Sequence, residues 1–152
     1  MPLHHLEHFL IQCADIDATK NWYVQVLGLR EGPHPDFKFP VAWLYLGDKD
    51  VLHLTQGGKN VNDNRKRYLG QQSDALHGSG VVDHVAFRCT GLRDVMEHLR
   101  QQKIEFRQRM VNDQGLYQLF LIDPNGVKIE LNFSNAEAQG MQPELMASEF
   151  QN

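Results

Sequence analysis

The stretch Asp123-Pro-Asn-Gly-Val-Lys-Ile-Glu-Leu-Asn-Phe133 contains a turn followed by a segment in which polar and apolar residues alternate. Alternation with a period of two is typical of a β-strand with one face buried and the other exposed. Lys128, Glu130 and Asn132 would then share the polar face, with Glu130 in the middle of the strand. A carboxylate there either faces solvent or has a function, and the rest of the chain helps to decide which.

A second feature is an internal repeat. His53 follows His8 by 45 residues, and Glu130 follows His84 by 46 residues, so one pair reproduces the spacing of the other. The patterns around the two pairs also agree, because each half shows an alternating segment and then a helical stripe. A repeat of this length indicates two copies of one structural unit.

Each copy is predicted to contain a strand, a helix and three further strands. In the first copy the helix should end at Gly28, because glycine is favoured just after a helix. The strands of the first copy are expected at residues 6–15, 29–32, 39–46 and 51–56. Those of the second are expected at residues 81–89, 104–109, 116–122 and 127–133, with a helical stripe at residues 92–99.

The whole chain is therefore expected to form one α+β domain over residues 1–152. The segment that connects the two copies, residues 57–80, is polar and contains glycines, so it is either a solvated linker or a loop that binds a substrate anion. We expect a helix at residues 143–150 in the tail. The expected parts are a first unit at about 5–56, the connection at 57–80, a second unit at about 81–133 and the tail at 134–152.

Composition excludes several classes of function. With 152 residues and 41% hydrophobic content, the chain can bury a sizeable core. A formal net charge of -4 gives no basic field for nucleic acid, so we expect no nucleic-acid partner. The apolar runs are too short for a secretory signal or a membrane span, so we expect a cytoplasmic protein without a membrane partner.

Four side chains of metal-binding type occupy related positions in the two copies. His8, His53, His84 and Glu130 would lie on the first and fourth strands of both units and on one face. Imidazole nitrogens together with a carboxylate suit Zn, Ni, Fe, Co or Mn. The sequence therefore predicts one divalent transition metal, although any one of these histidines alone would be weak support.

The chain resembles the vicinal oxygen chelate superfamily, which includes glyoxalases, methylmalonyl-CoA epimerases, extradiol dioxygenases and bleomycin-resistance proteins. The resemblance rests on His8-Phe-Leu-Ile, Asp83-His-Val-Ala-Phe87 and Phe120-Leu-Ile-Asp-Pro-Asn-Gly-Val-Lys-Ile-Glu-Leu131, together with the segment from Asn21-Trp-Tyr to Val26-Leu-Gly-Leu29. It implies two repeated βαβββ units forming a cup-shaped mixed sheet with helices outside. It also implies a divalent metal inside the cup, a small-molecule substrate with adjacent oxygens, and a homodimer.

The resemblance assigns roles to particular residues. The first-strand histidines become His8 and His84, and the fourth-strand carboxylate becomes Glu130. His53 occupies a position that is Glu or Gln in glyoxalases, so it is a fourth ligand, a general base or neither. Extradiol dioxygenases carry a substrate-contacting tyrosine where this chain has Phe120.

A substrate pocket is predicted from residues that share the inward face of the strands. Aromatic members would form either apolar walls or plain core, whereas basic members would bind an anion or reach solvent. Bacterial glyoxalases have a glutathione-contacting arginine where this chain has Gln12, so glutathione is not the expected ligand. The predicted pocket residues are Gln12, Trp43, Tyr45, Arg88, Phe120, Lys128 and Asn132.

Three functions remain open. The first is glyoxalase-like or epimerase-like lyase/isomerase chemistry, with an enediolate-type intermediate stabilised by the metal and a proton moved by Glu130 or His53. The second is an Fe(II) extradiol dioxygenase, which needs only His8, His84 and Glu130 as a facial triad. The third is a metal-free protein that sequesters a ligand. Four ligand-type residues count against the third, and Phe120 favours the first over the second.

Overall fold

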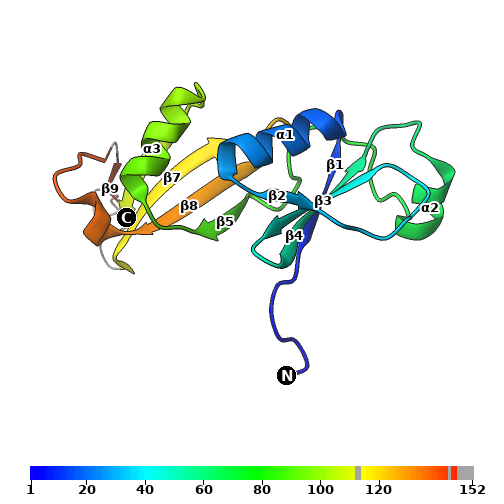
Figure 1. Cartoon of the computed structure of the whole chain (residues 1–152), viewed down its shortest axis with the longest axis horizontal. Coiled ribbons are helices and arrows are strands. Elements are labelled where there is room, and N and C mark those ends of the chain that lie inside the picture. Colours follow the sequence, from blue (N-terminus) through cyan, green and yellow to red (C-terminus); the bar gives the residue numbers. More distant parts are fainter. Residues whose placement is uncertain (112–113, 144, 147–152) are drawn as a thin grey trace. The chain divides into compact units, whose positions relative to one another are not determined.

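The chain divides into two units, Met1–Gly78 and Ser79–Asn152, and each has its own mixed β-sheet (Figure 1). The computed structural model describes residues 1–111, 114–143 and 145–146. None of the helices within these residues is long and apolar enough to cross a membrane. The predicted α+β fold with two βαβββ units is confirmed.

In the first unit, the sheet order is β1-β4-β3-β2. β1 runs parallel to β4, and the other neighbours are antiparallel. Helix α1 (Ile16–Leu27) contacts all four strands. The Asp15 side chain caps it by accepting a 3.0 Å bond from the Ala18 N–H, and Gly28 ends it at φ 77. The strands are β1 (Phe9–Cys13), β2 (Arg30–Gly32), β3 (Val41–Leu46) and β4 (Lys49–Gln56).

The second unit repeats this topology and extends it. Its sheet order is β5-β8-β7-β6-β9, with β5 parallel to β8 as β1 is to β4. Helix α3 (Leu92–Gln101) and the 3₁₀ helix η2 (Asn135–Ala138) contact each other. The strands are β5 (His84–Arg88), β6 (Arg107–Val111), β7 (Leu116–Ile122), β8 (Lys128–Ser134) and β9 (Leu145–Met146).

Three segments differ from the sequence-based expectation. The polar connection contains a helix, α2 (Asp63–Leu69). Asn62 caps it, because the Asn62 side chain accepts a bond from the Asn64 N–H. Strand β6 lies two to three residues later than expected. The helix expected at residues 143–150 is wrong at Leu145–Met146, which pair with β6 as strand β9. Residues 144 and 147–150 lie outside the described part of the chain.

The turn before β8 explains how Glu130 is placed. One Asp123 carboxylate oxygen accepts bonds from the Asn125 N–H at 2.7 Å and the Val127 N–H at 2.9 Å. Both Asp123 and Asn125 are buried. This side chain therefore substitutes for a backbone acceptor in the turn and fixes where β8 begins.

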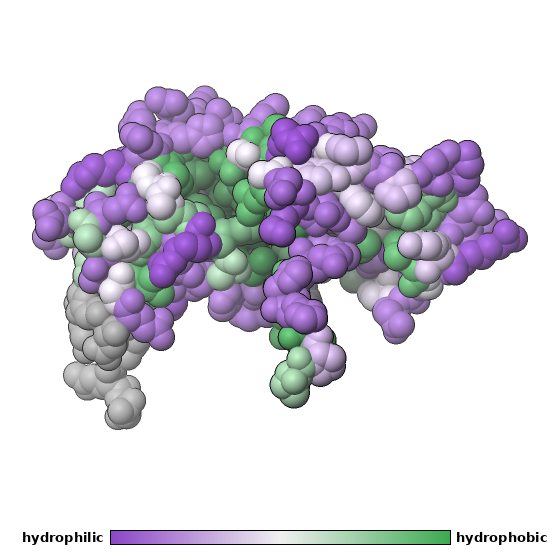
Figure 2. All heavy atoms as spheres, turned by 60° about the horizontal axis from the view of Figure 1, so that its bottom comes forward, coloured by the Kyte–Doolittle hydropathy of each residue, from purple (hydrophilic) through white to green (hydrophobic). Residues whose placement is uncertain are grey.

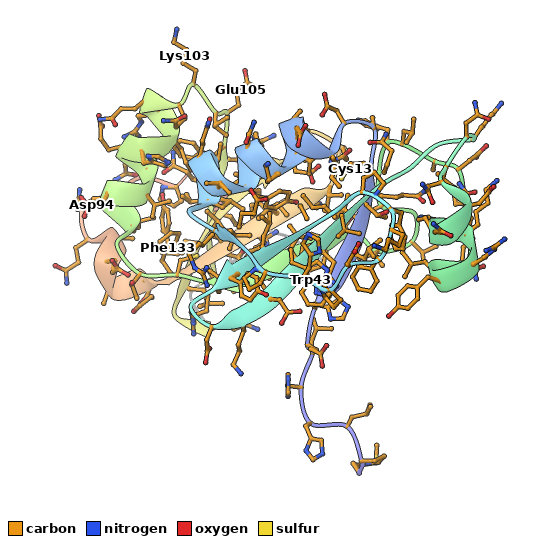
Figure 3. All side chains as sticks on the ribbon, turned by 45° about the vertical axis from the view of Figure 1, so that its right-hand side comes forward. Cys13, Trp43, Asp94, Lys103, Glu105 and Phe133 are labelled. Atoms are coloured by element: carbon orange, nitrogen blue, oxygen red, sulfur yellow. The ribbon has the colours of Figure 1, made fainter. Side chains whose placement is uncertain are left out.

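Each unit has its own apolar core. Leu44, Leu52 and Leu54 are fully buried in the first unit, and Leu119 and Ile129 in the second. Figure 3 labels two further buried core residues, Cys13 and Phe133, and shows Lys103 and Glu105 pointing outward. On the face seen in Figure 2, hydrophobic side chains gather in patches between wider hydrophilic areas.

Candidate functional site

Three aromatic rings stack in the first unit, two from neighbouring strands and one from the residue just before a third strand. The His53 ring lies 3.7 Å from the His8 ring and 3.9 Å from the Trp43 ring, with interplanar angles of 20° and 4°. Trp43 and His53 are cross-strand partners in β3 and β4, and His8 immediately precedes β1. His53 is therefore held between two flat side chains, with its own side chain only 10% exposed.

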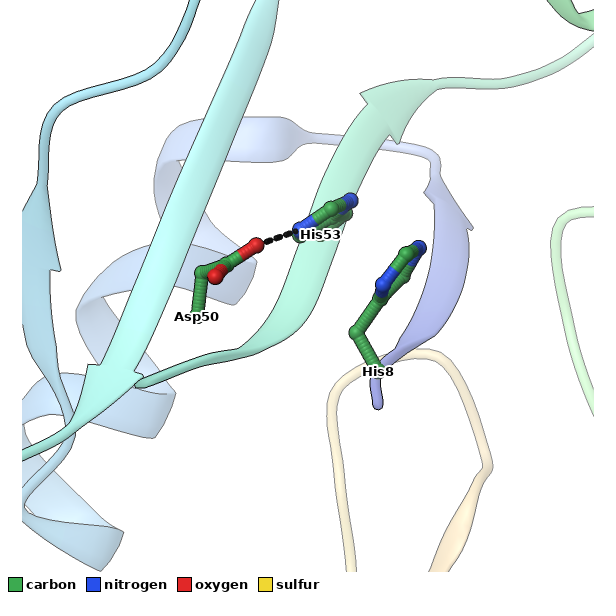
Figure 4. A group of neighbouring side chains, drawn as sticks. All are labelled: His8, Asp50 and His53. Carbon is green, nitrogen blue, oxygen red and sulfur yellow. Dashed lines mark hydrogen bonds and ion pairs between the residues drawn. The ribbon is translucent and has the colours of Figure 1, made fainter. Parts of the chain in front are cut away.

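Asp50 joins this cluster, which the sequence did not predict. Its Oδ2 lies 2.6 Å from His53 Nε2, and Figure 4 shows this bond beside the His8 ring. Simple alternation would place residues 50 and 53 on opposite faces. In β4, however, Leu52 pairs with Leu44 and Asp50 pairs with Tyr45, so one extra residue bulges between them. The bulge turns Asp50 onto the face of His53.

The charges of this pair follow from burial and hydrogen bonding. The bond to His53 lowers the pKa of Asp50, which keeps this carboxylate ionised. Burial lowers the pKa of His53, although the bond to Asp50 opposes that effect. A neutral imidazole beside an ionised carboxylate must donate through Nε2–H, since the carboxylate can only accept. The lone pair of His53 therefore lies on Nδ1, the state in which imidazole binds metals or takes a proton.

The first unit offers suitable metal ligands in a stacked arrangement. Ligand atoms of His8, Asp50 and His53 all lie within 4.8 Å of one another. Imidazole lone pairs lie in the ring plane, so two nearly parallel rings cannot direct both lone pairs at one ion. Two imidazoles and a carboxylate are donors that suit a divalent transition metal. For both histidines to bind one ion, however, one of the two rings has to turn.

In the second unit, the corresponding pair is His84 and Glu130. His84 Nε2 lies 3.8 Å from Glu130 Oε2, and the two side chains are 39% and 9% exposed. Two ligands of one tetrahedral zinc ion are roughly 3–3.5 Å apart. Only a small adjustment would let both groups reach one ion, so this pair also fits a metal.

Glu130 is oriented by a polar network that includes two residues absent from the sequence prediction. Gln118 donates to Glu130 Oε1 at 3.0 Å, and Asn132 donates to Glu130 Oε2 at 3.0 Å. Arg109 donates to Gln118 at 2.7 Å and lies 3.7 Å from Glu130. Gln118 is 5% exposed. The sequence signal that could have identified it is alternation, because Gln118 lies two residues before the predicted pocket residue Phe120 and shares its face.

His84 and Lys128 share a partner. Asp83 Oδ2 lies 2.8 Å from both His84 Nδ1 and Lys128 Nζ. The hydrogen bond from the Lys128 ammonium lowers the pKa of Asp83, and the bond to His84 lowers it further by a smaller amount. The charge of Lys128, which the sequence predicted either to bind a substrate anion or to reach solvent, is thus partly balanced within the second unit.

The remaining predicted pocket residues have varied surroundings. The Gln12 amide donates to the carbonyl oxygens of Ser73 and Ala75 and accepts from Arg65, so Gln12 binds the connection. The Tyr45 hydroxyl donates to the Pro33 carbonyl oxygen.

Like Lys128 and Asn132, the predicted pocket residues Phe120 and Arg88 belong to the second unit. The guanidinium of Arg109 lies 4.7 Å from the centre of the Phe120 ring. Arg88 is exposed at the end of β5.

A cleft of about 470 Å³ opens beside the stacked rings in the first unit. His8, Asp50 and His53 lie in its lining together with Trp43. Its other walls include Phe37 and Phe39 from the β2–β3 connection and Tyr68 from α2. A cleft of this volume is within the range of small-molecule sites.

A family model matches residues 5–131 and describes the Glyoxalase/Bleomycin resistance protein/Dioxygenase superfamily. The chain belongs to this superfamily. The match covers both βαβββ units, with His8, His53, His84 and Glu130 inside it. The resemblance drawn from the sequence motifs is thereby confirmed for the family.

Proteins similar to this chain include some named as enzymes and one named as a binding protein. Glyoxylase I 4 of Arabidopsis thaliana is 27% identical over 135 residues, covering 86% of this chain and 72% of the relative. A lactoylglutathione lyase structure from Agrobacterium tumefaciens matches with a TM-score of 0.60 at 16% identity, covering 88% of this chain and 96% of its own. An antibiotic binding protein from Streptomyces matches with a TM-score of 0.62 at 16% identity, covering 88% and 98%. At these identities the structures establish the shared fold.

Proposed function

We propose that this chain is a metal-dependent lyase or isomerase that acts on a small molecule with two adjacent oxygen atoms. His8, His53, His84 and Glu130 would hold one divalent transition ion per chain, and the protein would be a homodimer. The observation that carries this proposal is the 3.8 Å approach of His84 Nε2 to Glu130 Oε2. The Glu130 carboxylate is 9% exposed and held by two amide donors, so it is oriented beside His84 in a position to bind a cation or move a proton.

In this proposal His53 and Glu130 have different roles beside the metal ion. A bound ion would act as a Lewis acid toward the two substrate oxygens. His53 is neutral and held by Asp50, so its Nδ1 is available to bind the ion or accept a proton. Gln118 and Asn132 fix the carboxylate of Glu130, which can accept a proton at the oxygen facing His84.

An Fe(II) extradiol dioxygenase is the second candidate, and one observation favours it. The Nε2 of His53 is already bonded to Asp50, whereas His8, His84 and Glu130 would suffice for a facial triad. Phe120 argues against this alternative, because extradiol dioxygenases have a substrate-contacting tyrosine at the corresponding position.

The test begins with elemental analysis of protein purified without added metal. The native protein is then assayed with Ni, Zn, Mn and Fe(II) against hemithioacetals, 2-methyl-acyl thioesters and catechols. Under the isomerase proposal, His53→Ala lowers turnover by about 10²-fold or more, the usual scale for an acid–base group. His77→Ala, an exposed histidine of the connection, serves as the control and should leave turnover unchanged.

Two outcomes would overturn the proposal. Ring cleavage of a catechol that survives His53→Ala would favour the dioxygenase. A protein with no bound metal and no turnover would favour the third alternative, a metal-free protein that sequesters a ligand; the similar Streptomyces structure is of an antibiotic binding protein.

A further inference from the structure

The cleft of the first unit has an aromatic wall that the four metal-type residues do not explain. Phe37 is the centre of this wall, with its ring 5.0 Å from Tyr68, 5.5 Å from Phe39 and 6.1 Å from Trp43. These separations are typical of interacting aromatic side chains. The wall is assembled from the β2–β3 connection, strand β3 and helix α2, so it is a product of the tertiary fold.

Three of the apolar residues around the cleft are well exposed. Tyr68 is 66% exposed, Leu10 41% and Leu69 40%, and all three line the cleft. Clustered apolar side chains on a protein surface usually mark a place where another molecule binds. The volume of about 470 Å³ suits a small molecule with one ring system.

The opposite end of the cleft is polar, and its fixed charges are negative. His8 and His53 lie there with the carboxylates of Glu7 and Asp50. Lysine and arginine are missing from the described residues that line the cleft. Without a metal these two carboxylates repel an anionic ligand, and the divalent ion of the proposed function would balance their charge without leaving a positive excess to attract one.

From this distribution we propose that the cleft binds an uncharged small molecule that carries a planar aromatic group. The aromatic ring packs against Phe37 and Tyr68, and the oxygen-bearing end points toward His53. This names the substrate class of the enzyme proposed above and therefore rests on that function. Anionic adducts such as those of glutathione do not match the charges of the cleft.

The experiment compares three probes by isothermal titration calorimetry on the purified chain. 2-Hydroxyacetophenone is neutral and aromatic with two adjacent oxygens. Hydroxyacetone keeps the oxygens without the ring, and phenylglyoxylate keeps the ring but adds a carboxylate. We expect 2-hydroxyacetophenone to bind about tenfold or more tightly than either of the others, because only it satisfies both the aromatic wall and the negative end.

Substitutions then locate the binding. Phe37→Ala and Tyr68→Ala should each weaken 2-hydroxyacetophenone binding by about fivefold or more. Phe106→Ala is the matched control, because Phe106 is also a half-buried phenylalanine but lies in the second unit. Tyr68 is exposed, so its substitution keeps the test meaningful even if Phe37→Ala fails to fold.

Several results would overturn the inference. Equal binding of the three probes, or binding unaffected by both substitutions, would do so. A third contrary result would be that the probes bind without preference and that sedimentation shows a dimer turning into a monomer in Phe37→Ala or Tyr68→Ala. The aromatic wall would then be an interface between two copies of the chain. If the protein prefers the aromatic probe but shows no turnover with any of the metals, only the proposed function would be overturned. Turnover confined to aliphatic substrates would overturn only this inference.

Discussion

Asp50 and His53 lie on the same face of strand β4, although they are three residues apart. The bulge opposite Leu44 and Tyr45 produces this arrangement and lets the two side chains form a 2.6 Å bond. A carboxylate that holds the distal nitrogen of an imidazole fixes both its tautomer and its orientation.

Asp50 should therefore control the affinity of the protein for metal. Asp50→Ala is expected to weaken binding of Zn by about 10- to 100-fold, the usual effect of losing such a partner. Competition with a chromogenic chelator measures the affinity, and ¹⁵N NMR of the His53 ring reports whether the proton leaves Nε2. Asp48→Ala in the neighbouring exposed turn is the control. An unchanged tautomer and affinity in Asp50→Ala would show that Asp50 does not position His53.

Trp43 should report metal binding through its stack on His53. Bringing His8 and His53 to one ion requires the face-to-face rings to separate, which changes the surroundings of the Trp43 indole. Titration with Zn should alter the tryptophan fluorescence of the native protein. The change should disappear in Trp43→Phe, which retains Trp22 as its fluorophore. A signal that persists in Trp43→Phe would contradict this origin.

Gln118 should stabilise the second unit and the orientation of Glu130. Gln118→Met keeps the side-chain size but removes a buried donor from Glu130 and an acceptor from Arg109. The free energy of unfolding is expected to fall by about 1–3 kcal/mol, because buried polar groups lose partners. Urea denaturation followed by circular dichroism measures this, with Gln102→Met at an exposed position as the control. Equal losses for the two variants would argue against the network.

Strand β3 offers a matched pair for testing the core of the first unit. Leu44 is fully buried, whereas Leu46 on the same strand is 44% exposed. Leu44→Ala should lower the free energy of unfolding by about 2–5 kcal/mol, since it leaves a cavity in the core. Leu46→Ala should cost much less in the same denaturation experiment. Similar losses would mean that the burial of Leu44 is not what stabilises the unit.

Much of the fold could be predicted because its signals are local. Alternation located every strand of both βαβββ units to within a few residues, and β7 was predicted with its full bounds. The repeat matched His8 with His84 and His53 with Glu130 and placed all four on the same face of their strands, and the structure brings His8 beside His53 and His84 beside Glu130. Helix α2 was missed because its short segment, Asp63–Leu69, has no clear apolar stripe.

The sequence by itself determined the two units, their strand faces and the four metal-type residues, because side-chain direction along a strand follows from a period of two. The tertiary structure alone decided that Asp50 reaches His53, since a single bulged residue reverses that period. It also decided that Gln118 holds Glu130 and that Phe37, Trp43 and Tyr68 share a wall. These contacts depend on the register between strands and on the packing of distant segments, which no local pattern specifies.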